Sequence, residues 1–235
     1  TYPAHEREAR INGTPTLGSG RIYQHADEAV AESQIAIPAH WPRISGMDFG
    51  WEHKTAVVWL AWDRDNDTVH LYDAYGAPEQ TPMVHSVAIK GRGEWIPMAW
   101  PHDGLQHEKG TGDELKKQYL KYGVKMLVKQ ATHAPDQTAG QKEGEGGNSV
   151  ELGITELNER ILTGRFKVAK HLNDWFEEYR LYHRKDGKIV KLNDDFMDAT
   201  RYALMMLRHA KVQAQPQRKL MPGHQVTDRA TGVLG

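Results

Sequence analysis

Three aspartates in this 235-residue chain stand where an ordinary structural role explains a carboxylate poorly. Asp48 lies inside the short apolar run of residues 44–50, Ile-Ser-Gly-Met-Asp-Phe-Gly, although aspartate is depleted in β-strands. Asp103 follows the apolar run of residues 96–100, and acidic residues at strand ends of α/β sheets often line ligand crevices. Asp198 lies within a helical pattern of core-forming residues, where a carboxylate needs a cationic partner.

A strand aspartate, a strand-end aspartate and a helix aspartate together describe a compact carboxylate cluster, which binds one or two hard divalent cations. Two ions about 3.5–4 Å apart stabilise the attacking and leaving oxygens when a phosphodiester bond is cleaved. The chain contains no cysteine, so oxygen ligation favours Mg²⁺ or Mn²⁺ over Zn²⁺. The pattern therefore predicts a site for Mg²⁺ or Mn²⁺, with two ions expected.

Each aspartate also has a purely structural interpretation. Asp48 can begin a turn at a strand end, and Asp103 can belong to a turn before Gly104. Arg201, three residues after Asp198, is an ordinary ion-pair partner on the same helix face. A competing metal chemistry is a zinc phosphoesterase built on histidines, but the sequence has no His-x-His or His-Glu-x-x-His motif. The histidines closest to Asp103 are His102 and His107.

Asp194 and Asp195 precede Asp198 in the same helical pattern, so all three can share one helix face. The helix dipole alone favours acidic residues in a first turn by roughly 0.3–1 kcal/mol. Asp194 and Asp195 therefore need no catalytic role to be explained.

Five lysines follow Asp103 in the chain and can line a track for DNA phosphates, although a solvated helix face looks the same. They are Lys116, Lys117, Lys121, Lys125 and Lys129. The whole chain is nearly neutral, with 30 basic and 31 acidic residues, so only such local clusters can attract nucleic acid. Trp59 and Trp175 occupy core-like positions, and we expect them to pack inside rather than stack on bases.

The elements that must position these residues form an α/β pattern. Residues 44–50, 55–62 and 68–74 predict three strands in an antiparallel meander, and helices and strands alternate after them. Asn148 is the predicted cap of one helix, whose apolar face is Ile154, Leu157 and Ile161. The remaining expected elements are helices over 82–90, 113–122, 172–182 and 194–209, strands over 96–100 and 124–128, a loop over 129–149 and a tight turn over 185–188.

The sequence predicts one main domain over residues 44–210. Residues 1–43 are rich in Gly and Pro and are expected to form a linker, and residues 211–235 a flexible tail. Because residue 1 is Thr, we interpret the chain as a piece of a longer protein. No apolar run reaches the roughly 18 residues of a membrane span, and the first residues lack the pattern of a signal peptide. We expect a soluble protein of a reducing intracellular compartment.

The residues around the three aspartates resemble the C-terminal nuclease domain of the terminase large subunit, the DNA-packaging motor of tailed double-stranded DNA bacteriophages. The resemblance covers roughly residues 8–210 and points to the headful-packaging type. It is carried by four segments: Gly46-Met-Asp-Phe-Gly-Trp, Ala99-Trp-Pro-His-Asp-Gly, Glu156-Leu-Asn-Glu-Arg-Ile-Leu-Thr-Gly-Arg-Phe-Lys-Val and Asp195-Phe-Met-Asp-Ala-Thr-Arg-Tyr-Ala.

This resemblance implies a ribonuclease H-like α/β fold with a mixed sheet and flanking helices. It implies that Asp48, Asp103 and Asp198 are catalytic metal ligands, with Asp195 at an auxiliary position where relatives often have His. The implied activity is cleavage of concatemeric viral double-stranded DNA during packaging into the procapsid, in the host cell cytoplasm. The implied partners are DNA, the portal protein, the small terminase subunit and the protein's own N-terminal ATPase domain. No Gly-x-x-x-x-Gly-Lys-Ser/Thr phosphate loop occurs in this chain, so ATP hydrolysis is expected elsewhere.

Two other functions compete with a nuclease. An actin-like phosphotransferase also opens with a strand Asp followed by Gly, but it needs glycine-rich phosphate loops that the sequence does not supply. A non-catalytic scaffold that docks on the portal through its tail would keep the acidic residues without using them. Metal titration separates the scaffold from the nuclease, because a scaffold has no reason to bind Mn²⁺ tightly.

Overall fold

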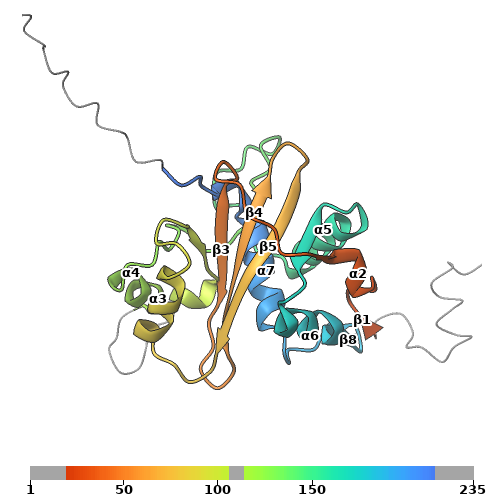
Figure 1. The fold of residues 1–235 in the computed structure, drawn as a ribbon, viewed down its shortest axis with the longest axis horizontal. Coiled ribbons are helices and arrows are strands. Elements are labelled where there is room, and N and C mark those ends of the chain that lie inside the picture. The colour runs from red at the N-terminus through yellow and green to blue at the C-terminus, as the bar shows by residue number, and fades with distance from the viewer. Residues whose placement is uncertain (1–19, 106–113, 215–235) are drawn as a thin grey trace, which may run out of the picture.

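The computed structural model describes residues 20–105 and 114–214, and a mixed six-stranded sheet forms their centre (Figure 1). The three longest strands are the predicted antiparallel meander, in which β3 pairs with β4 and β4 with β5. The outer strands β2, β7 and β6 run parallel to the neighbours with which they pair. From edge to edge the sheet is β2 (Ala31–Glu32), β7 (Phe166–Ala169), β5 (Thr68–Ala77), β4 (Thr55–Asp63), β3 (Arg43–Asp48) and β6 (Met98–Ala99).

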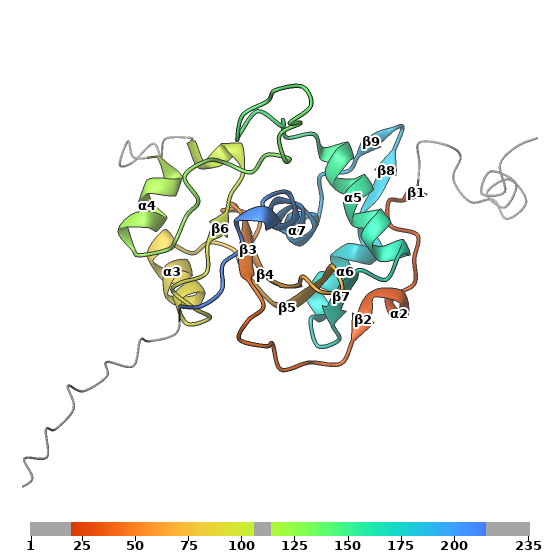
Figure 2. The same cartoon turned by 90° about the horizontal axis from the view of Figure 1, so that it is seen from above.

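Helices cover both faces of the sheet, with α7 (Asp195–Met205) lying across β3 and β4. Viewed from above, α7 lies over the middle of the sheet, with α5 (Val150–Leu162) beside it and α6 (Asn173–Leu181) next to β7 (Figure 2). The opposite face packs against α3 (Pro82–Lys90) and α4 (Leu115–Lys121). The α3 boundaries are those that the sequence predicts, and α4 is shorter than expected.

The two faces of β4 show how the alternation of a strand divides the core. Ala56, Val58 and Leu60 belong to the large cluster that contains α7, α5 and α6. Val57 and Trp59 point the other way, into the cluster formed with α3 and α4. Every residue of this stretch is fully buried, so β4 is a central strand that holds both helical layers. Trp59 and Trp175 are both core residues, as expected.

Residues 20–43 belong to the folded unit, so the prediction of a linker is wrong for this part of the chain. Strand β2 joins the large sheet beside β7, and Tyr23 and Val30 are buried in the main core. Strand β1 (Gly20–Arg21) pairs with β8 (His183–Lys185), which forms the expected hairpin with β9 (Lys188–Ile189). A short helix, α2 (Asp27–Val30), leads into β2.

Three other features of the structure differ from what the sequence led us to expect. Residues 124–128 make a single bridge, Met98 to Met126, rather than a strand. Strand β7 was not expected, because its four residues follow α5 directly and are recognisable only by their pairing with β5. The cap of α5 is Ser149 and not Asn148, since the Ser149 side chain accepts a hydrogen bond from the Leu152 amide.

The C-terminal helix ends earlier than predicted, and the 3₁₀ turn η2 (Leu207–His209) follows it. The other 3₁₀ turn of the described residues, η1 (His102–Leu105), follows β6. Residues 1–19, 106–113 and 215–235 lie outside the described part, and with them most of the predicted tail and His107. Among the described residues, no helix has the length and apolar character that crossing a membrane requires.

Candidate metal centre

Asp48 is directed to the helical layer by its place at the end of β3. Gly46, two residues earlier, faces the same side of the sheet and lies directly under α7. A methyl group at Gly46 would lie 2.2 Å from the carbonyl oxygen of Ala199 and 2.8 Å from the Ala203 Cβ. The glycine therefore permits the close approach of α7 to β3, and this approach brings Asp198 toward Asp48.

Asp103 reaches the same region because β6 runs parallel to β3, with Gly46 opposite Ala99. The carboxyl ends of two neighbouring parallel strands lie at one edge of a sheet. Asp48 is the last residue of β3, and Asp103 lies in η1, just beyond the end of β6. The strand-end position that the sequence assigns to Asp103 is thus the feature that places it beside Asp48.

The four predicted ligands line one cavity of about 360 Å³, together with Asp194. We call this cavity the aspartate pocket and define it by Asp48, Asp103, Asp194, Asp195 and Asp198. Its other lining residues come from the end of β3, the loop after it, the segment before α7, and α7: Phe49, His53, Lys191, Leu192, Asn193 and Tyr202.

Asp198 is the most enclosed member of the aspartate pocket and is only 5% exposed. Lys191 donates a hydrogen bond from Nζ to Asp198 Oδ2 at 2.7 Å. Arg201 Nη2 lies 3.1 Å from Asp198 Oδ1, so the structural partner foreseen for this aspartate is present. Even so, Oδ1 is buried without a hydrogen bond of proper geometry. It therefore retains a lone pair for a further cation.

Asp194 and Asp195 have partners that the sequence interpretation did not include. Lys191 Nζ lies 2.9 Å from Asp194 Oδ2, so one lysine bridges Asp194 and Asp198. His53 Nδ1 lies 2.6 Å from Asp195 Oδ1 across 142 positions of sequence. The i,i+3 spacing of Lys191 and Asp194 is visible in the sequence, whereas nothing local indicates the contact of His53.

Crowded carboxylates make the aspartate pocket electrostatically strained. Burial raises the pKa of Asp48 well above its ordinary value, and the charges of Asp198, Asp195 and Asp194 raise it further. Burial likewise raises the pKa of Asp194, against the opposing effect of Lys191. A divalent cation would remove this repulsion, because it replaces like-charge contacts by attraction.

The donor set fits a hard cation by its chemistry, since it offers carboxylate oxygens and no sulfur. As the side chains stand, no three histidine, aspartate or glutamate residues within 20–105 and 114–214 are already grouped around one metal position. The ammonium of Lys191 lies between Asp194 and Asp198, where it supplies part of the positive charge that a metal would bring. Side-chain rotation of Lys191 would therefore accompany the binding of a cation.

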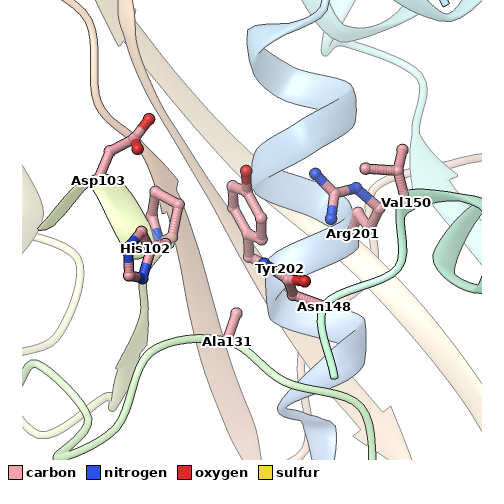
Figure 3. Close-up of a pocket in the computed structure, with 8 residues that line it drawn as sticks. His102, Asp103, Ala131, Asn148, Val150, Arg201 and Tyr202 are labelled. Carbon is pink, nitrogen blue, oxygen red and sulfur yellow. The ribbon is translucent and has the colours of Figure 1, made fainter. Parts of the chain in front are cut away.

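Two further hollows adjoin the aspartate pocket and share Asp103 with it. One, of about 470 Å³, is mostly apolar, and its lining includes Phe49, Trp51 and Tyr119. The other, of about 180 Å³, lies where η1, α7 and the start of α5 meet. Figure 3 shows this second hollow, with Tyr202 between the η1 residues His102 and Asp103 and the side chain of Arg201. Asp103 thus lines all three depressions.

The five candidate DNA-binding lysines are only partly available. Lys116 lies over the Trp100 ring, 4.5 Å from its centroid, and Lys117 pairs with Glu114 at 3.2 Å. Lys129 donates a hydrogen bond to the Glu143 carbonyl. Lys117, Lys121, Lys125 and Lys129 are nevertheless exposed at the surface.

Comparison with known proteins relates the chain to phage packaging proteins. The family described as "Terminase RNaseH-like domain" matches residues 45–207. The large terminase subunit of Salmonella phage P22 is 47% identical over 226 residues, which cover 94% of this chain and 43% of the relative. The corresponding protein of Enterobacteria phage LP7 is 49% identical over 207 residues, which cover 88% and 42%. The chain spans less than half the length of these relatives.

Solved structures give the same result. The P22 large terminase nuclease domain matches with a TM-score of 0.73 and 46% identity, over 84% of this chain and 97% of that one. The nuclease domain of the bacteriophage SPP1 large terminase, solved with bound Mn, matches with a TM-score of 0.53 and 17% identity. That match covers 76% of this chain and 95% of the other, and shows the fold alone. The chain belongs to the terminase RNaseH-like domain family and has the ribonuclease H-like mixed α/β fold expected from its sequence.

Proposed function

We propose that this domain is a divalent-metal-dependent endonuclease that cuts concatemeric viral double-stranded DNA during genome packaging. The observation that carries the proposal is the convergence of Asp48, Asp103 and Asp198 on one cavity from three separate elements. The SPP1 domain of the same fold was solved with bound Mn, which supports a metal in this class of domain.

Asp48, Asp103 and Asp198 are the proposed catalytic residues and ligands, and Asp195 is an auxiliary ligand that His53 orients. When bound, two ions of Mg²⁺ or Mn²⁺ would stabilise the attacking and leaving oxygens of the phosphodiester. The protein's own contribution is to hold the carboxylates close together. Lys191 and Arg201 offset part of the charge on Asp198 and limit the repulsion before a cation arrives.

DNA is proposed to approach along the three depressions that Asp103 lines, with the lysines on and after α4 attracting its phosphates. These are Lys116, Lys117, Lys121, Lys125 and Lys129. Each phosphate neutralised contributes a salt slope of about −0.9 in duplex DNA, so removal of one such lysine should weaken binding similarly for all sequences.

In the packaging machine, the domain is proposed to act with the rest of its own chain and with other proteins. The expected partners are an N-terminal ATPase domain, the portal protein and the small terminase subunit, in the host cell cytoplasm. Residues 211–235 are proposed to attach to such a partner and to be dispensable for cutting.

The test is cleavage of a supercoiled plasmid in Mg²⁺, in Mn²⁺ and in EDTA. Nicking or linearisation is expected with either metal and none with EDTA. A matched control is Asp174→Asn, which removes an exposed carboxylate from the first turn of α6. Metal-independent cleavage, or no cleavage together with no binding of Mn²⁺, would contradict the proposal, and the second result would favour a non-catalytic role.

A further inference from the structure

The first turn of α7 carries Asp195 and Asp198, yet the helix does not cap itself. Its N-cap residue, Asp194, makes no side-chain capping hydrogen bond. The side chain of Asp194 is instead engaged with Lys191. An uncapped helix end leaves backbone N–H groups that need acceptors from elsewhere.

Glu178 of α6 supplies that acceptor from another helix. Its Oε2 accepts a hydrogen bond from the Phe196 amide at 2.6 Å, and its Oε1 accepts one from Lys54 Nζ at 2.8 Å. Glu178 is only 1% exposed, and burial raises its pKa against the opposing effect of Lys54. A buried carboxylate is costly unless it is paired and hydrogen-bonded, and here both oxygens are used.

Glu178, Lys54 and Phe196 form a cluster, and the surrounding chain leaves room for it. Lys54 Nζ lies 4.8 Å from the centroid of the Phe196 ring, so its stem covers the start of α7. A methyl group at Gly76 would lie 2.9 Å from Lys54 Cδ and 2.9 Å from Phe196 Cζ. A glycine in β5 therefore leaves the space that Lys54 and Phe196 occupy.

The cluster is linked directly to the aspartate pocket. Lys54 follows His53, whose ring contacts Asp195, and Phe196 follows Asp195. The loop before β4 thus touches both the side chain of Asp195 and the carboxylate that anchors the next residue. A rotation of the first turn of α7 would move Asp195 and Asp198 together.

We propose that Glu178, neutralised by Lys54, is a positioning residue that fixes the first turn of α7 so that Asp195 and Asp198 face Asp48. This role rests on the proposed function, because it concerns the same metal centre. A role in stability alone would not require an ionised group, since a well-packed apolar replacement of a buried ion pair is often equally stable. The specific consequence of the charged pair is the orientation of α7.

The test compares Glu178→Leu, Glu178→Gln and Glu177→Gln by isothermal titration with Mn²⁺ on folded protein, and by amide hydrogen exchange in EDTA. Glu178→Leu removes both acceptors, whereas Glu178→Gln keeps an oxygen for the Phe196 amide. Glu177 is the exposed neighbour on the same helix and serves as the matched control. Loss of an orienting partner behind a metal ligand typically lowers affinity roughly 10–100-fold.

We expect Glu178→Leu to raise the Kd for Mn²⁺ by about that factor and to speed exchange at the Phe196 amide. Glu178→Gln should recover part of the affinity, and Glu177→Gln should match the wild type. If Glu178→Leu does not fold, Glu178→Gln and Lys54→Met decide the question, since each weakens the pair with less loss of volume.

Wild-type affinity for Mn²⁺ in the folded Glu178 variants would overturn the positioning role, even if their thermal stability fell. A wild-type protein that binds no Mn²⁺ would instead refute the proposed function itself. The two failures are therefore distinguishable in one titration series.

Discussion

Two acidic regions of this domain shift the pKa of a carboxylate in opposite directions. At the turn between β4 and β5, Asp67 accepts hydrogen bonds from Trp62 Nε1 at 3.0 Å and from Arg165 Nη1 at 2.6 Å, and Arg160 lies nearby. Partial burial opposes ionisation there, but these donors outweigh it and lower the pKa of Asp67. In the aspartate pocket, burial and neighbouring carboxylates raise the pKa of Asp48.

The difference separates a carboxylate that stabilises the fold from carboxylates that we propose bind a metal ion. Asp67 contacts two arginines, each of which also contacts a glutamate, and the indole of Trp62. In the aspartate pocket, one cation, Lys191, is shared between Asp194 and Asp198. A site that keeps like charges together without enough counter-charge sacrifices stability for binding. A raised carboxylate pKa inside a cavity supports the proposal that this pocket is the functional region.

The largest expected effect is on catalysis. Asp48→Asn, Asp103→Asn and Asp198→Asn should each lower plasmid cleavage by more than about 100-fold, which is the upper range for losing only an outer-shell partner of a metal ligand. Asp67→Asn should leave cleavage unchanged, because it lies in the other acidic region. Full activity in any one of the first three variants removes that residue from the site.

Gly46→Ala should damage the aspartate pocket without touching a charge. The added methyl group would collide with the backbone of α7, and overpacking of this kind costs about 1–3 kcal/mol. Chemical denaturation measures the loss of stability, and Mn²⁺ titration measures the displacement of α7 from β3. Unchanged stability would mean that α7 does not pack as closely on β3 as described.

In EDTA, removing a carboxylate from the aspartate pocket should lower stability at one position and raise it at another. Asp198→Asn weakens the interactions with Lys191 and Arg201 and should lower stability by about 2 kcal/mol, as for a hydrogen bond to a charged group. Asp48→Asn relieves repulsion and should raise the melting temperature. Thermal melts of both variants in EDTA check the signs, and a fall for Asp48→Asn would contradict the strained pocket.

The pH dependence of these changes should distinguish the two regions. The pKa of Asp48 is raised in the folded state, so a protonated Asp48 favours folding. This contribution to stability is complete below the unfolded pKa of about 3.9 and disappears as pH rises through the folded-state pKa. The gain from Asp48→Asn should therefore grow with pH. Asp67 has a lowered pKa and stabilises above about 3.9, so the loss from Asp67→Asn should vanish in acid. Melting curves from pH 3 to pH 8 in EDTA test both trends.

The smallest effect is expected at the surface of the Asp67 region. Arg165→Gln removes a partly exposed ion pair, and such pairs contribute roughly 0.2–1 kcal/mol. Its cost should shrink as salt is added, because exposed charges are screened. A large, salt-independent loss of stability in urea denaturation would show that this network is more than a surface feature.

Local patterns in the sequence determined many of the secondary-structure elements. The β-rich runs of the meander, the bounds of α3 and the apolar face of α5 follow from periodicity, which depends on neighbouring residues alone. The same reasoning found Asp48, Asp103 and Asp198 as carboxylates out of place, and Arg201 as a partner three residues from Asp198. Family resemblance then supplied the expected roles of these residues.

Only the tertiary structure decided what surrounds those aspartates. His53 meets Asp195 across 142 positions, and Glu178 reaches Phe196 from a different helix. Strand β7 and residues 20–43 are likewise held by pairing with distant segments. Such contacts depend on the order of strands in the sheet and on how closely α7 approaches β3, and side-chain periodicity carries no information about either. The sequence therefore determined which residues are chemically unusual, while packing decided which of them meet.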